Sequence, residues 1–562
     1  MKKYLLNIPL QLLSICLILA VATGCYHKLD QIPQSDLSEA SYWKSTNDLK
    51  LAANYFYAYL PTINSSDYGA FMDRYSIDAY SAQGPNSVSD GSRTTPGSDG
   101  VWSGNYRLIR ACNNFLEKSA GVIGDANEIR KYKGEAYFFR ALAYYQLVIR
   151  FGDVPLITRT FGISDSIINA PRSPREDVIN LIYADLDTAA AGLPQPNAIA
   201  AADYGRVSAT AALALKARMA LFEGTRQKFH GYGNPNQHLQ IALDASNAII
   251  SGGKHALFNY TPRPDSSYYY NFQYAGEGAA NKENILVRLY GQNSANNISG
   301  HTYARNLEQG YMIPTRTLCD AYLYTDGLPY TKSLLDSTTP SKQIRTLSEF
   351  SNRDRRMAQT IFNRNSFFLT AKYIPTFSFS PTGYKSMKYF VVQDWNDNPG
   401  YIDYQIIRYA EVLLTNAEAQ YELSGSIADA DLNKTINLLR ARAGLPNLTN
   451  AFVTANGLNM REEIRRERRV ELAFEGFRYW DLLRWKTAET ELVQDVKGIK
   501  IIPSEHTGQS APPSNVAKDA NNIVIVQAVS FRKFDPARDY LWPIPSQQIA
   551  LEPALTQNPK WE

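Results

Sequence analysis

The chain has 562 residues, of which 44% are hydrophobic and 20% are charged, with a formal net charge of +4 at pH 7. The 58 basic and 54 acidic residues are nearly balanced and form no long basic run, which argues against a nucleic-acid-binding protein. Four cysteines are too few for a disulfide-stapled scaffold.

The first residues predict an export signal. Lys2 and Lys3 precede a mostly apolar run over residues 12–21, and the small residues 22–24 lead directly into Cys25. The run is too short for a membrane-spanning helix, which needs roughly 20 apolar residues. A cysteine directly after small residues resembles the bacterial lipobox, in which the thiol is acylated. A plain secreted protein with an incidental cysteine is the alternative.

We therefore expect residues 1–24 to be a lipoprotein signal peptide and residues 25–40 to be a tether that begins at the lipidated Cys25. Several acyl chains on one cysteine anchor a protein firmly, because each buried methylene contributes about 0.8 kcal/mol. No later run approaches the length of a transmembrane helix. The mature chain is expected to be a globular body tethered to a membrane.

Residues 41–259 have the periodicity of a helical protein. Apolar residues recur at helical spacing in six segments. These are Ser41–Leu60, Asn105–Lys118, Glu128–Gly152, Ser173–Pro194, Arg206–Gly224 and Gln237–Gly253. Ser173, with Glu176 three residues later, forms a capping-box pattern. The small residues of these helices predict close pairing, as in helical-repeat proteins, although no strict repeat period is visible.

Two stretches lack this periodicity. Residues 64–100 are rich in Ser, Gly and Pro, and residues 260–400 are rich in Tyr, Asn, Ser, Gly and Pro. Long irregular segments inside a compact protein are typically functional or disordered. We expect binding residues in these two stretches, because their side chains are not needed for helix packing.

Helical patterns return in the last third of the chain, at residues 404–425, 429–446 and 467–485. The sequence thus predicts a mainly α fold with paired helices. We expect an N-terminal helical region at 41–259 and a more irregular, loop-rich C-terminal region at 260–562, which contains the irregular insert described above.

The common catalytic motifs are missing from the sequence. No HExxH helix, CxxC pair, P-loop or GxSxG elbow occurs, and the six histidines are scattered. We therefore expect no metal site and no cofactor. The remaining candidate for chemistry is ERRVELAFEGFRYWDLLRW, residues 467–485, where carboxylates stand among arginines and aromatic residues.

On a helix, side chains three or four residues apart are neighbours, so most acids of this segment are expected to face an arginine. A nearby guanidinium lowers the pKa of a carboxyl, whereas a general acid needs a raised pKa. We interpret the segment as a buried structural ion-pair lattice. The expected pairs are Glu471–Arg468, Glu475–Arg478, Arg478–Asp481 and Asp481–Arg484, and the full set of members is Glu467, Arg468, Glu471, Glu475, Arg478, Asp481 and Arg484.

Several blocks of sequence, in one order, resemble the SusD/RagB family of outer-membrane nutrient-binding lipoproteins. The resemblance covers almost the whole mature chain. The blocks are LDQIPQSDLSEASYW, GEAYFFRALAYYQLVIRFGDVPL, GRVSATAALALKARMALFEG, IIRYAEVLLTNAEA, LLRARAGLP, ERRVELAFEGFRYWDLLRW and YLWPIPSQQIALEPALTQNP.

The resemblance implies a SusD-like α-superhelical fold of helix pairs related to tetratricopeptide repeats, packed against the irregular C-terminal region. It implies a lipid-anchored protein on the outer membrane that faces the cell surface. It also implies a partner, a SusC-like TonB-dependent transporter, over which the lipoprotein acts as a lid. In this picture the protein captures a glycan and delivers it to the pore without covalent chemistry.

Sugars stack their C–H faces on aromatic rings and exchange hydrogen bonds with polar side chains. By resemblance to glycan-binding members, Trp102 and Asn105 are candidate ligand residues, although Trp102 can equally be read as packing a helix end. The irregular stretches offer further candidates. These are Asp73, Arg74 and Tyr80 in the first stretch, and Tyr269, Tyr274, Tyr290 and Tyr311 in the second.

Three functions stay open from the residues. The first is a non-catalytic glycan-binding lipoprotein, and the second is a binder of peptides or another nutrient on the same fold. The third is a glycan-active enzyme, which needs two carboxyls about 5–10 Å apart in a cleft. We expect the first.

Overall fold

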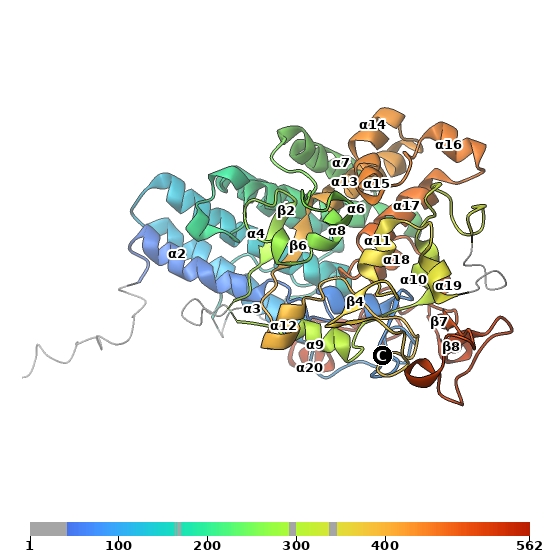
Figure 1. The fold of residues 1–562 in the computed structure, drawn as a ribbon. Coiled ribbons are helices and arrows are strands. Elements are labelled where there is room, and N and C mark those ends of the chain that lie inside the picture. The colour runs from blue at the N-terminus through green and yellow to red at the C-terminus, as the bar shows by residue number, and fades with distance from the viewer. Residues whose placement is uncertain (1–41, 163–164, 166–169, 292–298, 337–344, 562) are drawn as a thin grey trace, which may run out of the picture.

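The computed structural model describes residues 42–162, 165, 170–291, 299–336 and 345–561. The expected signal peptide, Cys25 and the tether lie outside these residues. Figure 1 shows a mainly α-helical protein, in which long helices from the first half of the chain form an array and a loop-rich part lies beside it. The predicted mainly α fold is confirmed.

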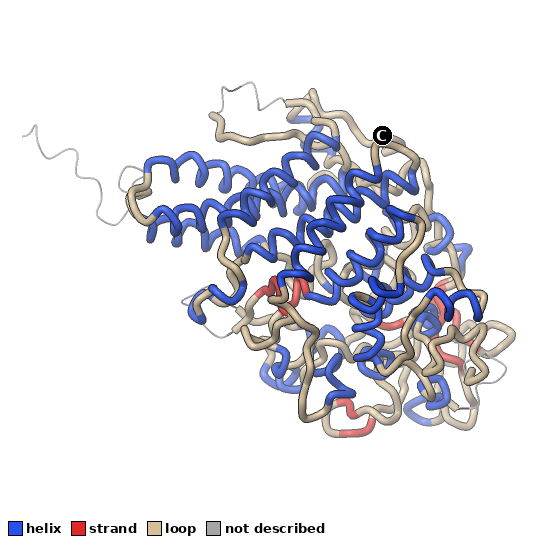
Figure 2. The backbone as a smooth tube through the Cα atoms, turned by 90° about the horizontal axis from the view of Figure 1, so that it is seen from above, coloured by secondary structure: helices blue, strands red, loops and turns tan. Residues whose placement is uncertain are grey.

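Long helices of the N-terminal half pack in chain order. α3 contacts α4, α4 contacts α5, α5 contacts α6, and α6 contacts α7, while α13 packs against α7 and extends the array (Figure 2). The bounds are α2 (Thr46–Asn54), α3 (Gly100–Lys118), α4 (Ala126–Phe151), α5 (Arg175–Gly192), α6 (Ala209–His230), α7 (Pro235–Gly252) and α13 (Tyr409–Ser424).

A glycine allows the closest approach of two of these helices. A Cβ atom added at Gly224 of α6 would lie 2.8 Å from Leu239 Cγ of α7, which is closer than side chains tolerate. The small residues in the α6 sequence therefore bring the two helix axes together, as their pattern predicts.

Two helix starts test the capping signals of the sequence. Ser45 and Asp48 form a complete capping box at the start of α2. The prediction of a capping box at Ser173 is wrong. Helix α5 begins at Arg175 after Pro174, without a side-chain cap. The Ser173 backbone instead bridges to Val154, so the residue belongs to the preceding loop.

The C-terminal half consists of shorter helices joined by long loops (Figure 1). They are α8 (Ser267–Tyr270), α9 (Tyr303–Glu308), α10 (Arg316–Ala321), α11 (Arg355–Thr360), α12 (Val392–Asp397), α14 (Asp429–Lys434), α15 (Ile436–Ala443), α16 (Asn450–Ala455), α17 (Met460–Glu471), α18 (Arg478–Arg484), α19 (Ala488–Glu491) and α20 (Ser546–Leu551).

Strands in the described residues form antiparallel two-stranded sheets. The pairs are β1 (Ala79–Tyr80) with β3 (Ile313–Pro314), β2 (Asn284–Arg288) with β6 (Tyr404–Arg408), β4 (Phe367–Phe368) with β5 (Ala371–Lys372), and β7 (Val496–Lys500) with β8 (Ile523–Gln527). In the first pair, a segment from each of the two irregular stretches of the sequence lies side by side.

One large hydrophobic core joins the two halves. It contains Phe139 of α4 and Leu215 of α6 together with Leu413 of α13 and Leu482 of α18. Because the N-terminal helices and the C-terminal region share this core, the surfaces they present are held in fixed positions relative to each other.

The chain leaves the helical conformation between α17 and α18. Phe474 and Gly476 have positive φ angles of 62° and 84°. A Cβ atom at Gly476 would lie 2.5 Å from the carbonyl oxygen of Gly69, so only glycine fits there. The segment predicted as one continuous helix is thus two helices with a sharp turn between them.

Cys112 and Cys319 are both buried and free, so they form no disulfide with each other. Among the described residues, no helix combines the length and the apolar character that crossing a membrane requires.

Candidate functional site

Partly exposed aromatic and charged side chains lie on and next to a 3₁₀ helix, η2 (Ala70–Tyr75), which contacts α9 through Phe71 and Tyr303, and on α9 and α12. Helices α9 and α12 contact each other and lie together in Figure 1. Arg74 of η2 donates from Nη1 to the carbonyl oxygen of Tyr311, just after α9, at 3.4 Å. We call the group Arg74, Arg305, Glu308, Tyr311 and Trp395 the aromatic surface.

Trp395 of α12 is the centre of the aromatic surface. The Cζ atom of Arg305 lies 3.7 Å from the centroid of its ring. The indole Nε1 donates to Glu308 Oε2 at 2.7 Å, and Arg305 Nη1 lies 3.6 Å from the same oxygen. The ring, the guanidinium and the carboxylate are therefore oriented before a ligand arrives.

The charged partners of Trp395 remain accessible to solvent. The side chains of Arg305 and Glu308 are 32% and 30% exposed, and the ring of Trp395 is partly exposed. A guanidinium offers N–H donors and a carboxylate offers acceptors. Both kinds of group thus stand beside an aromatic ring.

Arg74 and Tyr311 form the second part of the aromatic surface, and both are half-buried. Arg74 lies over the ring of Phe71 at 5.0 Å and donates from Nη2 to Ser66 Oγ at 2.6 Å. The ring of Tyr311 stacks on the ring of Phe71, with the two centroids 6.2 Å apart. The structure brings together these two residues, which the sequence predicted from two different irregular stretches.

Trp102 and Asn105, in contrast, belong to the core. Trp102 is 3% exposed and packs against Tyr106 and Phe151. Asn105 is 5% exposed, and its amide donates to the carbonyl oxygen of Val101 at 2.9 Å. Neither side chain offers a face to a ligand, because the first turns of α3 are packed against the end of α4. We leave both out of the candidate site.

Asp73 also has a structural position. It is 1% exposed, and its carboxylate accepts hydrogen bonds from the backbone N–H groups of Gly476 at 3.2 Å and Arg478 at 3.1 Å. Burial raises the pKa of Asp73 to about 7, against the lowering effect of these N–H donors. Its role is to hold η2 against the turn between α17 and α18. Tyr80 is half-buried in β1, where its backbone pairs with Ile313.

The three other predicted tyrosines are half-buried and have partners of their own. The hydroxyl of Tyr274 donates to the carboxylate of Asp394, the neighbour of Trp395 in the sequence. The hydroxyl of Tyr290 accepts from the backbone N–H of Ile63 at 3.0 Å. Tyr269 lies in the short helix α8, next to α11.

Sequence reasoning missed Trp395, Arg305 and Glu308. A signal for the tryptophan was present, since it stands in the polar run VQDWNDNPG, where no helical core pattern explains it. Arg305 and Glu308 gave no such signal, because charged residues three apart are common on short surface helices.

The ion-pair lattice is a separate, fully buried cluster. The carboxylate of Glu471, at the end of α17, lies 2.8 Å from Arg356 Nη1, 2.7 Å from Arg408 Nη1 and 2.5 Å from Arg442 Nη2. Burial alone would raise the pKa of Glu471, but the three guanidiniums outweigh it and hold the pKa well below its ordinary value. Such a carboxyl cannot act as a general acid.

Glu475 is held in the same way. It lies 2.7 Å from Arg408 Nη2 and 2.6 Å from Lys388 Nζ. Burial opposes ionisation, and the guanidinium and ammonium together still keep the pKa of Glu475 below its ordinary value.

The lattice partners differ from those expected on one helix. In the described part of the chain, the predicted pairs Glu471–Arg468, Glu475–Arg478 and Arg478–Asp481 do not form. Each of these side chains instead pairs with a residue of another element that packs against it. The expected pair Asp481–Arg484 does form, at 2.8 Å. The other contacts are Arg468–Asp481 at 2.9 Å, Arg478–Glu491 at 2.9 Å, Arg478–Asp78 at 3.6 Å, Glu467–Arg356 at 2.6 Å and Glu467–Arg440 at 3.2 Å.

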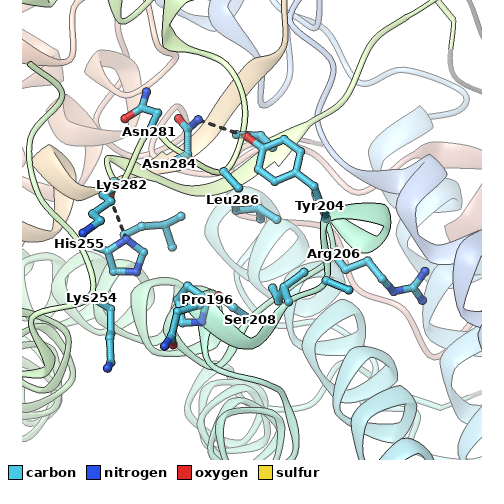
Figure 3. A pocket seen from close by; sticks show the side chains of 18 residues that line it. Pro196, Tyr204, Arg206, Ser208, Lys254, His255, Asn281, Lys282, Asn284 and Leu286 are labelled. Carbon is cyan, nitrogen blue, oxygen red and sulfur yellow. Dashed lines mark hydrogen bonds between the residues drawn. The ribbon is translucent and has the colours of Figure 1, made fainter. Parts of the chain in front are cut away.

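An enclosed cavity of about 160 Å³ lies between the loop before α6 and strand β2 (Figure 3). Its polar groups are bonded to the protein itself. Asn284 Nδ2 donates to the Tyr204 hydroxyl at 3.3 Å, and His255 Nδ1 donates to the carbonyl oxygen of Lys282 at 3.0 Å. The other ring nitrogen of His255 then accepts from Thr210 at 2.9 Å. No aromatic ring paired with a cation lines this cavity among the described residues, and we take the aromatic surface as the candidate site.

Comparisons with known proteins identify the family and agree with the fold. A family model described as the SusD family matches residues 279–561. A second model, described as starch-binding and associating with the outer membrane, matches residues 29–221. One SusD-like protein of Formosa agariphila is 26% identical over 99% of this chain and 99% of its own length, and another is 26% identical over 89% of this chain and 95% of its own.

Solved structures give the same result. A SusD-like carbohydrate-binding protein from Bacteroides fragilis aligns with a TM-score of 0.77 at 25% identity, covering 92% of this chain and 99% of its own. A second SusD-like protein from the same species aligns with a TM-score of 0.74 at 23% identity, covering 94% of this chain and 99% of its own.

Proposed function

The chain belongs to the SusD/RagB family, and on that premise we propose that it is a non-catalytic glycan-binding protein of the outer membrane. It captures an oligo- or polysaccharide at the aromatic surface and delivers it to a SusC-like TonB-dependent transporter. The family model described as associating with the outer membrane, and the carbohydrate-binding protein of similar structure, support this function.

The observation that carries the proposal is the preorganised group of Trp395, Arg305 and Glu308. Arg305 covers one face of the Trp395 ring and Glu308 lies at its edge, so a sugar would stack its C–H face on the opposite face of the ring and exchange hydrogen bonds with these charged groups. Because Arg305 and Glu308 already fix one another and the ring, a ligand pays little entropy to order them.

The lipobox-like segment that ends at Cys25 supports the proposed location at the outer membrane. Lipidation at Cys25 would hold the body at the membrane surface through the tether, residues 25–40. A globular body on such a tether can move against a membrane partner while staying attached. This motion suits a lid that closes on a transporter at the cell surface.

The lattice supports a non-catalytic role. The three glutamates that first suggested a catalytic group each contact two or more cations, and all three are buried. Glu277 and Asp403 are neighbouring carboxyls with raised pKa values, about 8 and about 6, mainly through burial. Neither belongs to the aromatic surface.

Calorimetric titration tests the function. The protein beginning after Cys25 is titrated with a panel of polysaccharides and with peptide digests. Trp395→Ala is compared with Phe531→Ala, which removes an aromatic ring that is 72% exposed at another place on the surface.

We expect saturable binding of one glycan that is lost in Trp395→Ala and kept in Phe531→Ala. If only the peptide digests give heat, the ligand is a peptide and not a glycan. Reproducible release of reducing sugar by the pure protein would overturn the non-catalytic role.

A further inference from the structure

A second cavity, of about 490 Å³, lies near the C-terminal residues and shares no residue with the aromatic surface. Among the described residues that line it are three cations, Arg93, Arg538 and Lys560, and no carboxylate. Its volume is within the range of small-ligand sites. The cavity is therefore large enough for a sugar unit and has a single sign of charge on its walls.

Arg93 is the most informative residue of the cavity. It is 7% exposed, and its Nη2 donates to both the Oδ1 atom and the carbonyl oxygen of Asp539, each at 3.3 Å. Within the described part of the chain, its Nε and Nη1 have no hydrogen-bond acceptor. These two nitrogens have almost no accessible surface, so Arg93 contributes its charge to the cavity, while Arg538 and Lys560 are the cations that a ligand can reach.

The carboxylate of Asp539, a described residue beside the cavity, is shared. Asp539 Oδ1 lies 3.3 Å from Arg93 Nη2 and 2.9 Å from Arg538 Nε. Its Oδ2 also accepts from the backbone N–H of Asp535 at 2.8 Å. One carboxylate thus serves two guanidiniums, and the exposed Lys560 adds a further charge. Counted over the described residues, the walls of the cavity keep an excess of positive charge.

An aromatic ring forms a fixed wall of the cavity. The Cζ atoms of Arg93 and Arg538 lie 5.1 Å and 4.5 Å from the ring centroid of Trp561. The indole nitrogen of Trp561 donates to the carbonyl oxygen of Leu541 at 3.1 Å, which holds the ring. Both guanidiniums are therefore oriented by the same ring.

Two uncharged polar residues of the wall are already bonded within the protein. Gln557 bonds through both ends of its amide to the backbone of Ile544 at 2.8 Å, and the Thr95 hydroxyl donates to the carbonyl oxygen of Trp561 at 2.9 Å. The charged groups of the wall that a ligand can reach are the cations Arg538 and Lys560. Their natural ligand is a group with only acceptors and a negative charge.

We propose that this cavity binds the oxyanion of an acidic saccharide, either a uronate carboxylate or a sulfate ester. That the anion is carried by a saccharide rests on the proposed function, whereas the preference for an oxyanion rests on the cavity alone. The site is a second point of contact for a ligand that also reaches the aromatic surface, or a separate site for a charged glycan.

The experiment titrates the protein that begins after Cys25 with three probes. They are trigalacturonate, which carries carboxylates, a sulfated neocarrabiose without carboxylate, and neutral maltotriose. The variants are Arg538→Gln and Lys560→Gln, which avoid the buried Arg93. Lys533→Gln is the matched control, because it removes an exposed lysine that does not line the cavity. Thermal unfolding of each variant shows that it is folded.

We expect one of the acidic probes to bind, and binding to weaken about tenfold in Arg538→Gln and Lys560→Gln, as for the loss of a charged hydrogen-bond partner. Lys533→Gln should leave this binding unchanged. Comparison of the first two probes identifies the carboxylate or the sulfate as the group bound.

Two results would overturn the anion site. One is the absence of heat from both acidic probes. The other is an equal loss of binding in Lys533→Gln and in the cavity variants. Such a loss would mean that the acidic probes respond to the general surface charge and not to the cavity. The proposed function is judged separately, by the loss of glycan binding in Trp395→Ala, so either proposal can fail without the other.

Discussion

Arg408 and Glu475 form a two-pronged ion pair inside the protein, with Arg408 Nε 2.7 Å from Glu475 Oε2 and Nη2 2.7 Å from Oε1. The two residues are only 1% and 4% exposed. The third nitrogen of the same guanidinium contacts Glu471 at 2.7 Å and Glu283 at 2.9 Å. One arginine at the end of β6 therefore ties together α17, the turn after it and the segment before β2.

Glu475→Gln should destabilise the protein by about 3–5 kcal/mol, because Arg408 and Lys388 are buried and lose the carboxylate that both of them contact. Denaturant unfolding followed by circular dichroism measures the change. Asp431→Asn is the control, since Asp431 pairs with Lys434 at 4.0 Å on the surface, where side chains are 39% and 71% exposed. It should cost at most about 1 kcal/mol. Similar costs for both would mean that the lattice contributes no more than surface pairs.

The lattice shows which part of the structure could be predicted from the sequence alone. Acids and arginines at helical spacing, with aromatic residues between them, correctly indicated a buried group of ion pairs. The partners of Glu471 lie far away in the chain, at Arg356, Arg408 and Arg442. Local spacing cannot reveal them, because these arginines lie on α11, β6 and α15, which pack against α17 only in the folded protein. Tertiary packing decided the pairs.

Trp102→Ala should destabilise the protein by about 3–5 kcal/mol, the cost of removing a large aromatic side chain from a core. Under conditions where the variant is folded, its glycan binding should equal that of the wild type, because the ring packs on Phe151 and Tyr106. Thermal unfolding and titration on the same sample test both parts. Weakened binding by a variant of unchanged stability would restore Trp102 to the ligand site.

The candidate site was only partly predictable for a similar reason. Arg74 and Tyr311 stood out as polar and aromatic residues in irregular stretches, and the structure brings them together. Trp102 stood out in the same way but is covered by α4. Exposure depends on what packs over a residue, and a single sequence carries little of that information for a residue at a helix start.

The pH dependence of stability should contain a contribution from Glu277. Burial, and then repulsion from Asp403, raises the pKa of Glu277 to about 8, although the backbone N–H of Asp403 lowers it. The folded state therefore binds this proton more tightly than the unfolded state, whose pKa is about 4.3. The resulting stabilisation is complete below that value and is lost as pH rises toward 8.

Glu277→Gln tests this sign, because the amide resembles the protonated carboxyl. The melting temperature of the variant should exceed that of the wild type at pH 9, and the difference should shrink as the pH falls to 5. Glu462→Gln makes the same change on a side chain that is 61% exposed and provides the baseline. A difference between Glu277→Gln and the wild type that stays constant with pH would mean that the substitution acts through packing.

Arg305→Gln should weaken glycan binding about tenfold while leaving the melting temperature nearly unchanged. The guanidinium lies 3.7 Å above the Trp395 ring and is 32% exposed, so its loss removes a cation–π contact and a hydrogen-bond donor without opening the core. Titration with the glycan identified for the wild type measures the change, and Arg107→Gln, an exposed arginine on α3, is the matched control. If Trp395→Ala abolishes binding and Arg305→Gln leaves it intact, the ring alone recognises the sugar and the charged partner only supports the fold of α9.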